Sequence, residues 1–167
     1  MSIGVELARL IAYSDHERAK WTAWAAADPS RLNAPFQAGG RFPTIWSLLD
    51  HLFLVERRHL SRLEGAVPPT ATGIADGDWK GLFEYADLVR ADLRHFAEEL
   101  DDTEAAQVLT WTAVAPAPPG TYSMTRGKLM THILLHEIRH LAQIAYAVRL
   151  QGHEPPGEHD YFYCPEG

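Results

Sequence analysis

The chain has 167 residues, of which 46% are hydrophobic and 22% are charged, a composition that indicates one globular domain over residues 1–167 and excludes disordered and collagen-like classes. The formal net charge of −7, without a basic cluster, argues against nucleic-acid binding. The apolar runs are too short to span a bilayer, which argues against a membrane protein. The single cysteine, Cys164, predicts no internal disulfide and is interpreted as an incidental thiol. We therefore expect a soluble cytoplasmic protein.

Four segments without proline carry apolar residues at helical spacing, and each is predicted to be a helix. They run from about Ile3 to Ala27, Thr44 to Glu64, Trp79 to Leu100 and Arg126 to Gln151. Thr44, Asp76 or Asp78, and Ser123 or Thr125 are the expected N-caps, and Gly152 is the expected stop. The fold class predicted is all-α, a four-helix bundle with long connections. We expect no sustained strand, although residues 107–112 fit a short extended piece.

Nine histidines are present, and three of them, His132, His136 and His140, are spaced by four in the last helix. Side chains four apart share a helix face, so two of them can bind one ion. The apolar stripe places His136 and His140 at the border of the buried face and His132 closer to solvent. Glu137 falls in the middle of the buried stripe, where a carboxylate needs a partner. It is a candidate metal ligand, ligand partner or general base.

A bundle site also needs a ligand from a facing helix. The second helix offers His51 and His59. Helical periodicity slightly favours His59, because His51 lies toward an edge of its apolar stripe. Both residues therefore remain candidates, and His16 and His95 are expected at the surface.

The stretch from Leu129 to Ile144, which contains the three spaced histidines and then Gln143, resembles the closing helix of the DinB-like superfamily of bacterial metal-binding four-helix bundles. The family pattern there is His-x3-His followed by Arg-Gly-Gln, and this chain has Leu141 and Ala142 in place of the Arg and Gly. Residues 45–63, in which His51 is followed five residues later by Glu56, resemble the second helix of the family. The tail over residues 152–163 resembles the family's proline-rich tail with its aromatic cluster.

This resemblance implies a divalent metal, zinc or nickel, held by His51, His136 and His140. It also implies a small-molecule substrate and a low-molecular-weight thiol such as bacillithiol or mycothiol as cosubstrate. The activity expected on this basis is that of a metal-dependent thiol S-transferase or a related hydrolase, with Glu137 and Glu56 as the nearest proton-handling groups. Relatives often dimerise, so the resemblance also implies a homodimer.

Two other functions fit the same residues. One is a non-catalytic metal-binding or stress-response bundle. The other is a small zinc metallopeptidase, because residues 136–140 read His-Glu-x-x-His and Glu137 could then activate a zinc-bound water. Gln143 and Tyr146 stand where the longer peptidase pattern has Gly and His, and no strand that would align a peptide is evident.

Overall fold

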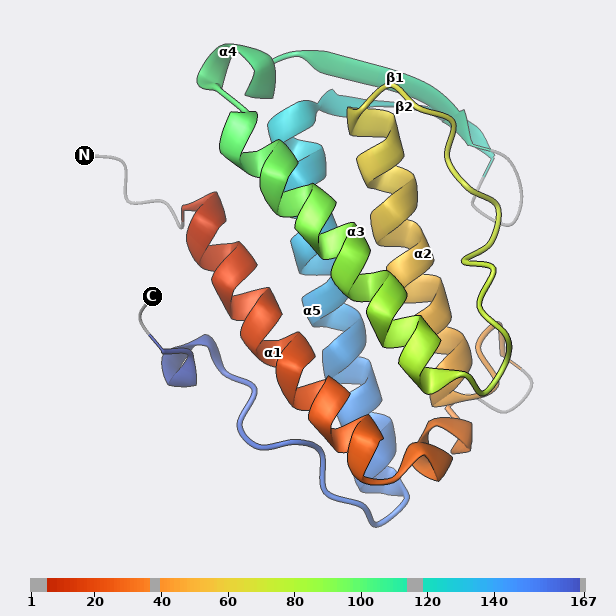
Figure 1. The fold of residues 1–167 in the computed structure, drawn as a ribbon. Helices are drawn as coiled ribbons and strands as arrows, with labels where there is room; N and C mark the ends of the chain where they lie inside the picture. The colour runs from red at the N-terminus through yellow and green to blue at the C-terminus, as the bar shows by residue number, and fades with distance from the viewer. Residues whose placement is uncertain (1–5, 37–39, 114–118, 166–167) are drawn as a thin grey trace.

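The structure of the protein is a computed structural model that describes residues 6–36, 40–113 and 119–165. Its four long helices confirm the predicted four-helix bundle (Figure 1). These are α1 (Leu7–Ala27), α2 (Ile45–Leu63), α3 (Trp79–Glu99) and α5 (Arg126–Leu150). Shorter elements are η1 (Pro29–Asn33), α4 (Asp102–Ala105), β1 (Val108–Ala113), β2 (Gly120–Thr125) and η2 (Tyr161–Tyr163).

The bundle has long connections, as the sequence predicted. Helices α1 and α2 each pack against both α3 and α5. Helices α1 and α5 run in one direction and α2 and α3 in the other (Figure 1). Residues 64–78 therefore run back along the bundle from the end of α2 to the start of α3.

Helices α2, α3 and α5 begin at predicted capping residues. Thr44 Oγ1 accepts a hydrogen bond from the Ser47 amide at 3.2 Å, and the Ser47 hydroxyl accepts one from the Thr44 amide at 3.1 Å, so the two residues form a capping box. Asp78 caps α3 by accepting from the Gly81 amide at 3.0 Å, and Thr125 caps α5 by accepting from the Lys128 amide at 3.2 Å. Gly152, with φ of 77°, follows the end of α5. The start of the first predicted helix, residues 3–5, lies outside the described residues.

The expectation that no strand is sustained was wrong. The extended piece is β1, and it pairs antiparallel with β2 so that Trp111 lies opposite Tyr122. Their rings stack with centroids 6.0 Å apart. In strand β2, GTYSMT, only Tyr122 and Met124 alternate with polar residues, which is too short a pattern to predict a strand without its pairing with β1. The hairpin lies over the end of the bundle where α2 ends and α5 begins (Figure 1).

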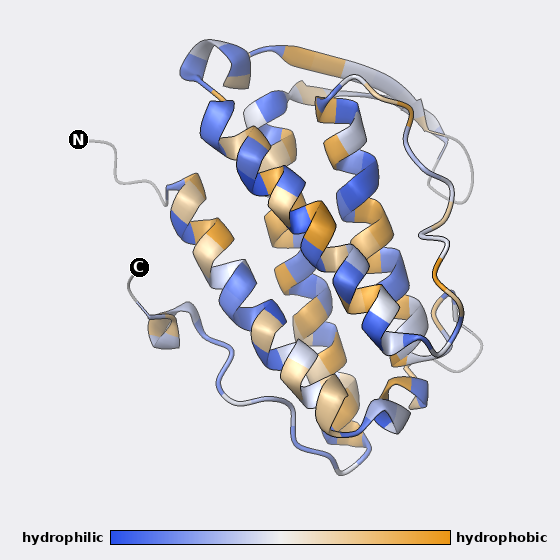
Figure 2. Cartoon of the chain, viewed as in Figure 1, coloured by the Kyte–Doolittle hydropathy of each residue, from blue (hydrophilic) through white to orange (hydrophobic). Residues whose placement is uncertain are grey.

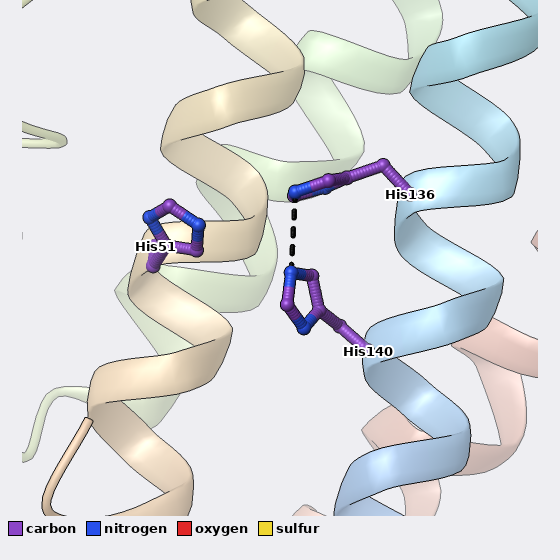
Figure 3. Close-up of side chains that lie close together, drawn as sticks. All are labelled: His51, His136 and His140. Carbon is purple, nitrogen blue, oxygen red and sulfur yellow. Dashed lines mark hydrogen bonds between the residues drawn. The ribbon is translucent and has the colours of Figure 1, made fainter. Parts of the chain in front are cut away.

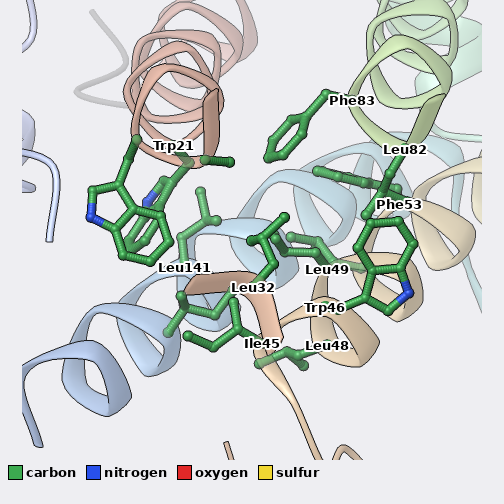
Figure 4. Close-up of a cluster of buried hydrophobic side chains, with 14 of the residues drawn as sticks. Trp21, Leu32, Ile45, Trp46, Leu48, Leu49, Phe53, Leu82, Phe83 and Leu141 are labelled. Carbon is green, nitrogen blue, oxygen red and sulfur yellow. The ribbon is translucent and has the colours of Figure 1, made fainter. Parts of the chain in front are cut away.

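The hydrophobic core consists of two clusters, one toward each end of the bundle. The cluster nearer the start of α2 includes Trp21, Leu49, Phe53, Leu82 and Leu141 (Figure 4). The cluster nearer the hairpin includes Ile11, Leu60, Leu93, Leu129 and Ile133. Colouring by hydropathy shows both polar and apolar residues along each long helix (Figure 2). No helix in the described part of the chain is both long and apolar enough to cross a membrane.

A layer of buried charges lies between these two clusters. Arg18 of α1, Glu56 of α2, Arg90 of α3 and Glu137 of α5 are each no more than 4% exposed. Arg18 Nη2 lies 2.5 Å from Glu56 Oε2 and 2.7 Å from Glu137 Oε1. Arg90 Nε lies 3.0 Å from Glu56 Oε1, and Arg90 Nη2 also donates to Glu137. Within the layer each charge therefore contacts two charges of opposite sign, and Arg90 Nη1 also lies 3.6 Å from Asp15 Oδ1. The layer connects all four long helices.

The C-terminal tail is attached to α1. His159 Nδ1 lies 2.6 Å from Glu17 Oε2, and the His159 ring stacks on Trp21 with centroids 5.6 Å apart. Trp24 Nε1 donates to the Glu154 carbonyl at 2.9 Å. The carboxylate of Glu17 is 4% exposed, so this is a buried attachment point.

We expect the Glu17 contact to depend on pH. Burial opposes ionisation of Glu17, but the hydrogen bonds from His159 and Lys20 outweigh it and leave the pKa of Glu17 below its ordinary value. The stabilisation is therefore present above the unfolded-state pKa of about 4.3 and is lost as pH falls through the lower folded-state pKa. Glu17→Gln should lower the free energy of unfolding at pH 7 by about 1–3 kcal/mol.

Urea unfolding at pH 7 and at pH 3 measures this effect. The gap between wild type and Glu17→Gln should narrow at the lower pH, because pH 3 lies below the unfolded-state pKa of Glu17 and protonation then favours the unfolded state. Glu98→Gln, at an exposed position of α3, is the matched control and should differ little from wild type at either pH. A gap of equal size at both pH values would contradict the prediction.

Candidate metal centre

Three histidines from two facing helices converge near the middle of the bundle. Helix α2 supplies His51, and α5 supplies His136 and His140, which lie one turn apart (Figure 3). One nitrogen from each ring lies within 4.8 Å of the other two. His136 Nε2 and His140 Nε2 are 3.1 Å apart. Two nitrogen ligands on a tetrahedral zinc ion lie about 3.3 Å apart, so the spacing fits a shared metal ion.

Gln143 fixes the orientation of the His140 ring. The amide oxygen Oε1 of Gln143 lies 2.7 Å from His140 Nδ1, and because this oxygen can only accept, Nδ1 donates the proton. The lone pair of the neutral ring is then on Nε2, the nitrogen that faces His136. This arrangement is common around metal-ligating histidines. This contact was not predicted from the sequence, although the i,i+3 spacing of Gln143 from His140 could have indicated it.

The three rings are neutral at pH 7. Burial, with smaller contributions from Arg41 and other cationic groups, lowers the pKa of His51 to about 4. Burial and the neighbouring His140 lower the pKa of His136 to about 2, and burial also lowers the pKa of His140. Neutral imidazole is the form that binds a metal ion, so the rings need not lose protons first.

Phe42, which precedes α2, covers one side of the cluster. Its ring centroid lies 4.6 Å from that of His51 and 6.5 Å from that of His140. The sequence analysis did not identify Phe42, because residues before a helix have no periodic signal. An apolar ring at this position limits the access of water to the histidines.

His59, the alternative third ligand, lies elsewhere. Its ring centroid is 5.3 Å from His132 and 6.2 Å from Trp111. Its Nδ1 lies 3.3 Å from Arg62 Nη1, and because arginine only donates, Nδ1 accepts and the ring proton is on Nε2. Among the described residues, the three histidines whose geometry suits a metal ion include His51 and not His59. Helical periodicity had slightly favoured His59. His132 is exposed, as predicted.

The two carboxylates named as proton handlers are both part of the buried charge layer. Glu137 Oε1 accepts from Arg18 Nε at 2.9 Å, and Glu137 Oε2 accepts from Ser14 and Arg90. Burial opposes its ionisation, but the charges of Arg18 and Arg90 outweigh burial and keep the pKa of Glu137 below its ordinary value. Glu56 pairs with the same two arginines. Successive residues of a helix are rotated by about 100° about its axis, so the side chain of Glu137 points in a different direction from that of His136.

Comparison with known proteins agrees with this architecture. The model of the DinB family matches residues 3–164. The chain belongs to the DinB family. Among solved structures, this DinB protein is similar to YfiT from Bacillus subtilis, described as a probable metal-dependent hydrolase with an unusual four-helix bundle topology. The match has a TM-score of 0.68 and 16% identity over 92% of this chain and 94% of that chain, which shows a shared fold. A search of curated proteins gave no match.

Proposed function

We propose that this DinB protein binds a divalent metal ion, zinc or nickel, through His51, His136 and His140, and that it is a metal-dependent thiol S-transferase acting on small molecules. The observation that carries the proposal is the convergence of three neutral imidazoles, while the two carboxylates named as proton handlers, Glu137 and Glu56, are paired with arginines. Three protein ligands leave an open coordination position, which is typical of catalytic rather than structural sites. Imidazole suits several transition metals, so both ions are included. A cytoplasmic homodimer is part of the same proposal.

A bound ion would supply the positive charge that favours the thiolate form of a thiol at neutral pH. The protein then needs no general base, in agreement with the engagement of Glu137 and Glu56 by arginines. The three histidines hold the ion, Gln143 orients His140, and Phe42 limits access of water. In the transfer, the thiol proton goes to solvent, the sulfur forms a bond to the electrophilic carbon, and the leaving group departs with its bonding electrons.

The alternative activity is hydrolysis, which the description of YfiT supports because the two proteins share a fold. A peptidase of the His-Glu-x-x-His type would need Glu137 beside a metal-bound water. The hydrogen bonds of Glu137 to Arg18, Arg90 and Ser14 argue against that role. Hydrolysis of small esters does not depend on Glu137 and is the second candidate.

The experiment is a direct comparison of the two reactions. Protein loaded with zinc or nickel is mixed with a panel of low-molecular-weight thiols and the chromogenic electrophile 1-chloro-2,4-dinitrobenzene, whose chloride is the leaving group. A parallel assay follows hydrolysis of p-nitrophenyl acetate, and casein tests for peptidase activity. We expect thiol conjugation that exceeds the uncatalysed rate and disappears with a chelator or in His136→Ala. Hydrolysis without conjugation would overturn the transferase assignment, and neither reaction would favour a non-catalytic metal-binding bundle.

A further inference from the structure

The three candidate ligands belong to a longer row of histidines between α2 and α5, which we call the histidine strip. It consists of His51, His140, His136, His132 and His59. Neighbouring ring centroids along it are 5.7, 4.4, 5.7 and 5.3 Å apart. From His51 to His59 the strip extends about 12 Å along α2, since a helix rises 1.5 Å per residue. Trp111 of the hairpin lies at its far end, 6.2 Å from His59.

Positive charge is concentrated on this strip, although the chain is acidic overall. The cations that act on its rings, and contribute to lowering the histidine pKa values, are Arg41, Arg58, Arg62, Lys128 and Arg139. Of the chain's 12 arginines, seven form ion pairs within the described part of the protein. Four of the five arginines without such a pair are the four beside the strip, and the fifth is Arg149. The unpaired positive charge therefore lies mainly where the candidate metal centre lies.

Arg62 is the cation of this group that contacts both the strip and the hairpin. It is half-buried, and burial together with the neighbouring Arg58 lowers its pKa. Its guanidinium lies 5.3 Å from the Trp111 ring centroid, and its Nη1 donates to His59 Nδ1. These two contacts hold the side chain in place, yet no carboxylate among the described residues forms an ion pair with it. A partly buried cation of this kind is stabilised by an anion.

His59 holds Arg62 from one side. Because Nδ1 accepts from Arg62, the remaining ring proton is on Nε2, on the far side of the ring. Burial and the charge of Arg62 lower the pKa of His59 to about 3, so the ring is neutral at pH 7. His59 therefore positions Arg62, and the guanidinium N–H groups that His59 does not occupy are the donors suited to the two oxygens of a carboxylate.

We propose that Arg62, positioned by His59 and Trp111, binds the carboxylate of a small-molecule substrate whose reacting end lies at His51, His136 and His140. This inference rests on the proposed function, because it places a thiol at the metal centre, and it defines the substrate class as a carboxylate-bearing thiol. Arg62 is thus a specificity-determining residue. Because His132, beside His59, lies one turn from His136 on α5, the carboxylate and the sulfur must be separated by a chain that spans at least one helical turn, about 5.4 Å.

The test measures binding rather than activity. Zinc-loaded protein is titrated by calorimetry with 6-mercaptohexanoate and with its neutral analogue 6-mercaptohexanol. We expect the acid to bind about 10-fold more tightly, the effect of one charge-assisted interaction. Arg62→Gln should remove this preference and leave the affinity for the alcohol and the zinc content unchanged, and Arg62→Lys should restore part of it. Arg57→Gln is the matched control, because Arg57 is on the same helix and pairs instead with Asp92 and Glu64.

The outcomes separate this inference from the proposed function. Equal binding of the two thiols by the wild type would overturn the carboxylate site but still support a thiol at the metal centre. A preference that survives in Arg62→Gln would also overturn the assignment to Arg62. Binding of neither thiol would contradict the proposed transferase, and the inference would fail with it.

Discussion

Substitution of Glu137 by glutamine should lower the free energy of unfolding by about 3–5 kcal/mol, the usual cost of breaking a buried ion pair by removing one partner. Glu137 is 1% exposed and accepts hydrogen bonds from Arg18, Arg90 and Ser14. Glutamine retains the shape but brings an NH₂ group into a site where the neighbouring guanidinium groups are all donors. The change also leaves two arginines with only one buried carboxylate, Glu56.

Urea unfolding followed by circular dichroism measures this loss, and thermal unfolding should show a decrease in Tm on the order of 10 °C. Glu84→Gln makes the same chemical change at an exposed position of α3 and should alter stability by less than about 0.5 kcal/mol. A Glu137→Gln protein of wild-type stability would contradict the assignment of Glu137 to a structural layer.

A paired substitution distinguishes a structural from a catalytic role for the layer. Arg90→Met combined with Glu137→Leu removes one charge of each sign and leaves Arg18 and Glu56 2.5 Å apart. Replacement of a buried ion pair by apolar residues is often neutral for stability. The double variant should therefore be more stable than Glu137→Gln alone, and it should retain metal binding. If Glu137 were instead the general base of a peptidase, its substitution would abolish catalysis and leave stability unchanged.

Substitution of His136 by alanine should weaken zinc binding by more than about 100-fold, because loss of even an outer partner of a ligand costs 10–100-fold. Metal content measured by mass spectrometry should fall from about one ion per chain to near zero, and His51→Ala and His140→Ala should behave in the same way. Zinc should raise the Tm of the wild type, because a ligand that binds only the folded state stabilises it, and should not raise that of these variants. His95→Ala, at an exposed position of α3, is the control.

The same experiment identifies the third ligand and the role of Gln143. His59→Ala should retain zinc. Nδ1 of His59 accepts a hydrogen bond from Arg62 and Nε2 carries the ring proton, so neither nitrogen has a free lone pair for a metal ion. Gln143→Leu should weaken binding by an intermediate 10–100-fold, because it removes the acceptor that orients His140. Zinc that is retained in His51→Ala and lost in His59→Ala would overturn the assignment of His51.

Local information in the sequence was sufficient for much of the fold. The starts at Thr44, Asp78 and Thr125 and the end at Gly152 depend on residues within one turn of the helix terminus, so their chemistry can be read directly. The pairing of β1 with β2 could not be read in this way, because the alternation in β2 covers only Tyr122 and Met124 and the strand depends on a partner.

The candidate site also has features that follow from one helix and features that depend on tertiary packing. The i,i+4 spacing of His136 and His140 and the burial of Glu137 follow from the geometry of a single helix, and the sequence by itself determined both. Periodicity left His51 and His59 open, and the family resemblance implied His51. Only the tertiary structure shows that His51 faces them and that Arg18 and Arg90 neutralise Glu137. Periodicity fixes which side of a helix is buried, whereas the axial position of one helix against another is set by packing of the whole core. Residues two turns apart, such as His51 and His59, share a similar side of α2 and can be distinguished only by that packing.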